Sequence, residues 1–129
     1  MLVEQRERCL LARIGFSLCR LGLIRQAEAI FDGLAESEPE RDGPAAGLAL
    51  CHIVKGECEA ATALLDRRLA KGSPIAPQLT LYKLLALGMA GRLPEARELR
   101  RKMEQEGMGE AAKTADLLLE DMSRDKPGA

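Results

Sequence analysis

Glycine and alanine recur along this chain at intervals of 34 and 35 residues. When the sequence is laid over itself, three glycines align, and three alanines align five residues after them: Gly22, Gly56 and Gly91, then Ala27, Ala61 and Ala96. A period of this length is typical of arrays in which each small unit buries its apolar face against its neighbour. The repeat therefore restricts the fold more strongly than any other feature of the sequence.

The aligned segments have the pattern of a helical hairpin. In each one, apolar residues at helical spacing lead to a glycine, and five residues later an alanine lies in a second apolar helix. Glycine ends the first helix because it adopts the left-handed backbone conformation without a Cβ clash. The small alanine then lets the second helix pack closely against the first. The segments are LCRLGLIRQAEAIF (18–31), HIVKGECEAATALL (52–65) and LGMAGRLPEARELR (87–100).

One hairpin cannot cover its own apolar face, whereas three stacked hairpins can. The pattern predicts one all-α domain over residues 1–123, with repeats at about 8–41, 42–76 and 77–108 and a capping helix at 110–123. Residues 124–129 are expected to form a flexible tail. The expected helices are 3–21, 24–37, 44–55, 58–71, 76–90, 93–106 and 110–123.

Composition limits the function classes open to the chain. Its 129 residues are 47% hydrophobic and carry a formal net charge of −1, which is typical of one folded domain. Only 2% of the residues are aromatic and there is no basic excess, so nucleic-acid binding is not expected. No apolar run is long enough for membrane insertion, and the N-terminal region around Glu4 and Glu7 lacks the pattern of a secretory signal. We therefore expect a cytoplasmic protein.

The chain offers no constellation for catalysis or metal binding. Its cysteines, Cys9, Cys19, Cys51 and Cys58, lack the short spacing of metal or redox sites and are expected to be free, mostly buried thiols. The only histidine, His52, follows Cys51 directly, but adjacent helical residues point about 100° apart and cannot share a proton. No nucleotide-binding, hydrolase or metalloprotease motif is present. We expect neither an enzyme nor a bound metal or cofactor.

The segment from Leu11 to Pro39 resembles the tetratricopeptide repeat. Where that family has a small residue, a large apolar residue, an alanine, an aromatic residue and a proline at fixed spacing, this chain has Gly15, Leu18, Ala27, Phe31 and Pro39. The second and third repeats keep part of the pattern, at Ala49, Ala61, Leu65, Leu87 and Ala96, with Pro74 one residue late. The third departs from it at Leu84 and Arg100. The resemblance implies a right-handed solenoid of three tetratricopeptide-like helical hairpins plus a C-terminal capping helix.

The repeat number, the chain length and the run LLARIGFSL near the N-terminus are also similar to the tetratricopeptide chaperones of bacterial type III secretion systems. The best match in size is to the chaperone that keeps the needle subunit in the cytoplasm, often beside a small helical co-chaperone. In that family a concave groove holds an amphipathic helix of the needle protein and prevents its premature polymerisation. The resemblance implies the same role and the same partners for this chain.

In tetratricopeptide proteins the first helix of each repeat lines the groove, so the resemblance implies which side chains face a partner. Nearly all are apolar: Ala12, Phe16, Cys19, Ala46, Leu50, Ile53, Val54, Leu81, Leu85 and Met89. A carboxylate clamp would need basic and amide side chains there, and only Arg13 and Arg20 lie nearby. An apolar groove favours an amphipathic helix, and Leu50→Glu or Leu85→Glu should abolish its binding yet leave the helicity of the chain intact.

Four alternatives remain open. The most remote is an enzyme, which would need polar residues that converge in the groove. Several of these apolar side chains would, in the simplest interpretation, pack under the final helix instead of facing a partner. A chaperone for the pore-forming translocators of the same secretion system would share the repeat architecture. A tetratricopeptide scaffold without any role in secretion would share it too.

Overall fold

The computed structural model describes the backbone of residues 2–124 and the side chains of residues 6–124, a range with seven α-helices and no β-strand. The helices are α1 (Leu2–Arg20), α2 (Ile24–Ser37), α3 (Asp42–Val54), α4 (Cys58–Ala70), α5 (Ala76–Met89), α6 (Leu93–Gln105) and α7 (Gly109–Arg124). The all-α class is confirmed, and every helix end lies within two residues of its expected position. Arg124 belongs to α7, and the rest of the expected tail lies outside the described residues. Within residues 2–124, no helix combines the length and the apolar character needed to cross a membrane.

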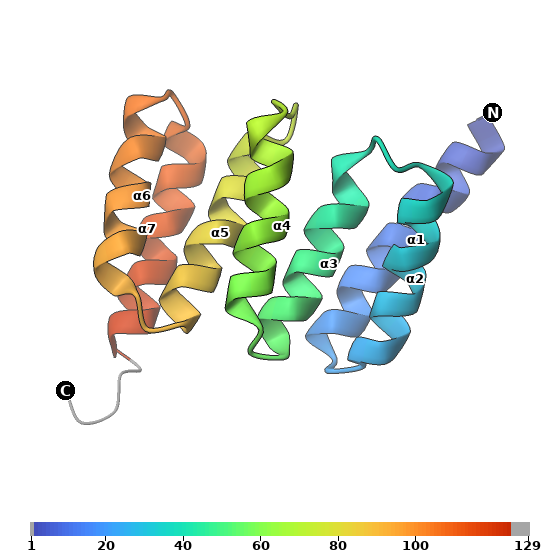
Figure 1. Ribbon diagram of the computed structural model, residues 1–129, viewed down its shortest axis with the longest axis horizontal. Coiled ribbons are helices and arrows are strands. Elements are labelled where there is room, and N and C mark those ends of the chain that lie inside the picture. The colour runs from blue at the N-terminus through green and yellow to red at the C-terminus, as the bar shows by residue number, and fades with distance from the viewer. Residues whose placement is uncertain (1, 125–129) are drawn as a thin grey trace.

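The helices are stacked along the longest dimension of the molecule, from α1 and α2 at one end to α6 and α7 at the other (Figure 1). Each helix packs against the next, and the odd-numbered helices also pack against one another, α1 with α3, α3 with α5 and α5 with α7. In the described part of the chain, no such contact joins α2 to α4 or α4 to α6. Because the odd-numbered helices lie closer together than the even-numbered ones, the array curves toward the odd-numbered side.

The turn after α3 shows why glycine recurs at the repeat period. Gly56 has a φ of +82°, and the N–H groups of Gly56 and Glu57 donate to the carbonyls of Ile53 and His52 at 3.0 and 2.7 Å. These two bonds close the end of the helix, and they need a left-handed residue, which is strained when it carries a Cβ. The same conformation occurs at Gly22, Gly91 and Gly107. The pairs α1–α2, α3–α4, α5–α6 and α6–α7 are therefore joined by turns of one geometry.

Replacing Gly56 by alanine is expected to lower the free energy of unfolding by about 1–2 kcal/mol, because a Cβ is strained at this positive φ. Gly33 in α2 is the matched control, since an added Cβ meets nothing within 4 Å at either position. Gly33→Ala should raise the stability by up to about 1 kcal/mol, because alanine favours the helix. Urea denaturation followed by circular dichroism measures both changes. Equal effects of the two substitutions would contradict the strained turn.

The core consists of three clusters that follow one another along the array. The first joins α1, α2 and α3, the second α3, α4 and α5, and the third α5, α6 and α7. Each cluster contains one of the aligned alanines, Ala27, Ala61 or Ala96, and none of these three has exposed surface. A larger side chain at these positions would push two helices apart. The alanine period of the sequence thus corresponds to fully buried positions in the three clusters.

Candidate functional site

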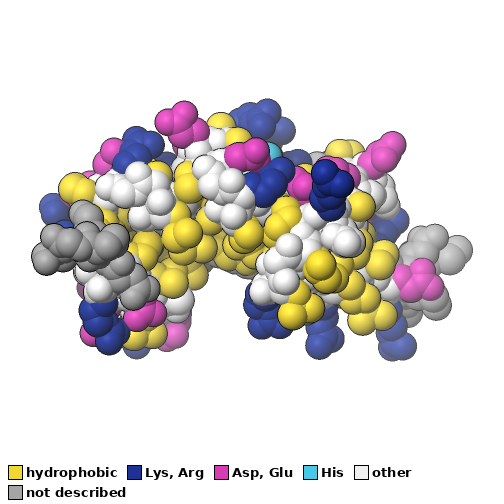
Figure 2. Space-filling view, turned by 90° about the horizontal axis from the view of Figure 1, so that it is seen from below, with side chains coloured by type: hydrophobic (Ala, Val, Ile, Leu, Met, Phe, Trp, Pro, Cys, Tyr) yellow, Lys and Arg dark blue, Asp and Glu magenta, His cyan; other side chains and the backbone are white. Residues whose placement is uncertain are grey.

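The array is hollowed on one side. Figure 2 shows the molecule as an arch whose two ends project beyond the middle, and hydrophobic side chains gather in the hollow between them. Charged side chains lie mainly over the outer surface and the two ends in this view. The direction of the curvature places the odd-numbered helices on the inner side, since only these pack against one another. We call the accessible apolar side chains of the two middle inner helices, Leu50 and Val54 of α3 with Leu85 and Met89 of α5, the concave face.

The ten side chains expected to line a groove differ widely in exposure. Val54 and Met89 are exposed, at 48% and 59%. Five are half-buried: Ala12, Phe16, Leu50, Leu81 and Leu85. Cys19, Ala46 and Ile53 are buried, at 3%, 0% and 3% exposure. The expectation needs correction for these three, because they belong to the core clusters that join α3 to its neighbours.

The half-buried leucines contribute to the core as well as to the surface. Leu50 packs against the cluster of α1, α2 and α3, and Leu85 packs against the cluster of α3, α4 and α5. Leu81 packs against the cluster that contains α7, as the alternative interpretation expects. A charge at Leu50 or Leu85 would therefore disturb folding as well as binding. Val54 and Met89, each one helical turn further along, are the cleaner positions for a test.

A cavity of about 470 Å³ opens where α1 meets the start of α3 and the start of α5. Two of the expected groove residues, Ala12 and Phe16, line it. Its other apolar lining residues are Leu34, Pro44, Pro74 and Ile75. Charged side chains surround it, namely Arg8, Glu38, Glu40, Arg41 and Asp42. The sequence did not indicate this cavity, because the two proline-containing segments that form its wall lie far apart along the chain.

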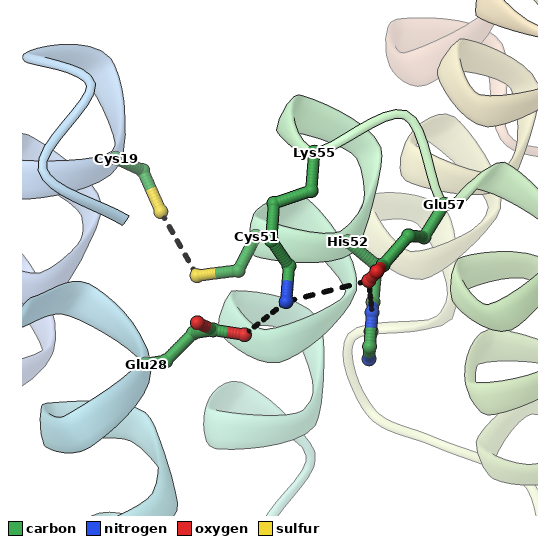
Figure 3. Close-up of polar contacts among 6 residues, drawn as sticks. All are labelled: Cys19, Glu28, Cys51, His52, Lys55 and Glu57. Atoms are coloured by element: carbon green, nitrogen blue, oxygen red, sulfur yellow. Dashed lines mark hydrogen bonds and ion pairs between the residues drawn. The ribbon is translucent and has the colours of Figure 1, made fainter. Parts of the chain in front are cut away.

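Charged side chains surround the turn between α3 and α4 (Figure 3). Lys55 Nζ lies 2.6 Å from a Glu28 carboxylate oxygen and 3.3 Å from one of Glu57, and His52 Nδ1 donates to Glu57 Oε1 at 2.7 Å. The hydrogen bonds from His52 and then Lys55 lower the pKa of the Glu57 carboxyl. The hydrogen bond to Glu28 raises the pKa of Lys55. All four side chains are accessible to solvent, and ion pairs between accessible side chains contribute little stability. We therefore assign this group only the role of connecting α2 to the turn.

Cys51, the neighbour of His52, points toward α1 (Figure 3). Its Sγ lies 3.2 Å from the Sγ of Cys19, and both thiols are buried. Burial, followed by the contact with Cys19, raises the pKa of the Cys51 thiol to about 12. All four cysteines are free, as expected, but Cys58 is only half-buried and Cys9 is exposed.

Alkylation of the folded protein should follow this order of burial. Near neutral pH, iodoacetamide is expected to modify Cys9 first and Cys51 last, because only the thiolate reacts and Cys51 is both covered and held protonated. Peptide mass mapping at a series of times measures each site. Denaturant should make the four rates similar. Modification of Cys51 as fast as Cys9 without denaturant would contradict the packing of α1 on α3.

A second apolar surface lies on α1 and the turn that follows it. Leu10 and Ile14 lie at i and i+4, so they share one face of α1, and they are 56% and 41% exposed. Leu21, in the turn that follows α1, is 74% exposed. Leu11 and Leu23 beside them are also exposed. Within the described chain, α1 packs only against α2 and α3, which leaves this face open. The groove expectation did not include it, although the spacing of its leucines was a detectable signal.

Comparison with known proteins finds no match for this chain among protein-family models, curated proteins or solved structures.

Proposed function

We infer that the chain is a tetratricopeptide-type solenoid in which three hairpins, α1–α2, α3–α4 and α5–α6, stack in a right-handed array that α7 caps. The 34- and 35-residue period supports this fold, as do the left-handed glycines that recur with it. The three fully buried alanines support it further, because they occupy the same place in successive helix pairs. The curvature toward the first helix of each pair is the curvature that such a solenoid requires.

The function that this geometry supports best is protein binding on the concave face. The observation that carries the proposal is the apolar hollow on the side of the odd-numbered helices. We assign to it the exposed Val54 and Met89 and the half-buried Leu50 and Leu85 because they belong to the inner helices α3 and α5. Contiguous exposed apolar surface in a folded domain marks a site of interaction. An amphipathic helix fits such a hollow, because its apolar stripe gains about 25 cal/mol for each Å² removed from water.

The biological role that we propose is that of a cytoplasmic type III secretion chaperone for a needle-type subunit. The concave face would cover the apolar stripe through which subunits polymerise and would release it when the subunit is exported. No cofactor and no catalytic residue takes part in this mechanism. The proposal rests on chain length, repeat number and the N-terminal run, in addition to the apolar hollow.

Two related functions use the same surface. A translocator chaperone would bind a segment of a large amphipathic protein instead of a small helical subunit. A tetratricopeptide scaffold would bind its partner without any effect on polymerisation. The exposed apolar face of α1 favours a second contact in each case, and in the needle-chaperone proposal a small helical co-chaperone would occupy it.

Binding is tested directly by fluorescence, because the chain contains no tryptophan. A synthetic amphipathic helix from a needle-type subunit, with one tryptophan on its apolar stripe, should show a saturable blue shift when the chain is added. A peptide of the same composition with a scrambled stripe is the control. Equal shifts for both peptides, or none, would contradict helix binding on the concave face.

The chaperone role is tested separately with the whole needle-type subunit. An equimolar amount of the chain should keep the subunit soluble and prevent fibres, as measured by light scattering and sedimentation. Binding of the peptide without any delay of polymerisation would favour the scaffold. Preference for a translocator segment over the needle-type helix would favour the translocator chaperone.

A further inference from the structure

The structure brings together two cysteines that lie 32 positions apart in the sequence. Cys19 is in the last turn of α1, and Cys51 is in the last turn of α3. Their sulfur atoms are 3.2 Å apart (Figure 3). A disulfide bond has a sulfur–sulfur distance of about 2.05 Å, so bond formation requires an approach of only about 1 Å. We expect side-chain rotation to supply a movement of this size.

The surrounding core holds the two sulfur atoms in this contact. Cys19 and Cys51 belong to one cluster with Ala27, Phe31 and Leu34 of α2, and they are 3% and 0% exposed. The cluster packs α1 and α3 against the same helix, which keeps the two cysteine-bearing helix ends side by side. Neither Cys9 nor Cys58 belongs to the buried part of this cluster. The pairing is therefore specific to Cys19 and Cys51.

We propose that Cys19 and Cys51 form a reversible disulfide site, which a peroxide closes and a dithiol reductant opens. This inference is independent of the proposed function. It assigns to the chain a modification that joins the first inner helix covalently to the second.

The reaction proceeds in two balanced steps. The Cys19 thiol first loses its proton, and the thiolate attacks one peroxide oxygen and breaks the O–O bond. This yields a sulfenic acid and a hydroxide, which takes up the proton that Cys19 lost and becomes one water. The sulfur of Cys51 then attacks the Cys19 sulfur, and the hydroxyl group leaves with the Cys51 proton as a second water. In sum, two thiols and one peroxide give one disulfide and two waters, with each sulfur losing one electron to the peroxide oxygens.

The position of α1 explains how a peroxide reaches a buried pair. As the first helix, α1 packs only against α2 and α3 within the described chain, so it can separate locally while α4–α7 remain folded. Cys19 belongs to the helix that separates and is the less buried residue of the pair, so it reacts first. Cys51, whose raised pKa makes it a poor nucleophile toward reagents in solution, reacts second because Cys19 lies in contact with it.

The test uses the full chain with Cys9→Ser and Cys58→Ser, which leaves only the buried pair. Hydrogen peroxide should convert this variant to a monomer whose mass is lower by two hydrogens and which contains no alkylatable thiol. Digestion under non-reducing conditions should then yield one pair of linked peptides. The melting temperature should rise by about 5–15 °C, because the bond constrains the unfolded chain, and dithiothreitol should reverse the shift.

The matched controls add Cys19→Ser or Cys51→Ser to the same background, and neither should show the shift in melting temperature. The wild-type chain gives a second measurement of the disulfide that needs no substitution. In it, oxidation of the exposed Cys9 shows that the oxidant was active. Two alkylatable thiols at positions 19 and 51 after full oxidation of Cys9 would overturn the proposal. A linked product with a lower melting temperature would overturn it too, because the bond would then not fit the native packing.

Discussion

Phe31→Ala is expected to lower the free energy of unfolding by about 3–5 kcal/mol, the largest effect of any single truncation in this core. Phe31 has no exposed surface, and its ring fills the space between Gly15 of α1 and Gly47 of α3. Its ring centroid lies 4.8 Å from that of Phe16 in an edge-to-face contact. Because glycine has no side chain that can refill the space, the cavity left by truncation stays open. Urea denaturation followed by circular dichroism measures the loss.

The opposite change, at Gly47, tests the same contact. A Cβ added there would lie 2.3–2.4 Å from three atoms of the Phe31 ring, so Gly47→Ala should cost about 1–3 kcal/mol. At Gly88 the added Cβ would meet the flexible end of Met122 instead, and Gly88→Ala should cost less. Phe31→Leu combined with Gly47→Ala should be more stable than the sum of the single changes predicts. Additive effects would mean that the ring and the glycine do not share this space.

Val54→Glu combined with Met89→Glu is expected to weaken binding of the amphipathic helix by at least about 100-fold. Both side chains are exposed in the free chain, so the substitutions should leave its stability within about 0.5 kcal/mol of the wild type. On binding, each new carboxylate would be buried against an apolar stripe without a partner for its charge. The tryptophan fluorescence titration measures the affinity, and thermal unfolding checks the fold.

Leu117→Glu is the control for this pair. Leu117 is 65% exposed, and it lies on the side of α7 opposite the buried Ala112, Ala115 and Leu119. Its substitution adds the same charge to an exposed apolar position outside the concave face and should not change the affinity. If Leu117→Glu weakened binding as strongly as the pair does, the partner would not bind in the hollow. Unchanged affinity of the variant with Val54→Glu and Met89→Glu would also mean that the partner does not bind in the hollow.

The sequence predicted the positions of the helices more accurately than it predicted the concave face. The Gly56 turn and the buried Ala61 follow from local pattern, since a left-handed glycine and a small packing residue act within a few residues of their own position. The exposure of Val54 and the burial of Ile53 beside it do not follow from such a pattern, because both residues are apolar and adjacent. The difference depends on which side of α3 meets its neighbours.

The sequence by itself determined seven helices, the turns between them and the small residues that let them pack, because helix ends and apolar spacing are local properties of the chain. Only the tertiary structure decided that Cys19 meets Cys51 and that Phe31 lies between two glycines of different helices. It alone also decided which apolar side chains remain accessible in the hollow. The physical reason is that burial depends on how closely separate helices approach, and this distance arises from the packing of all their side chains together.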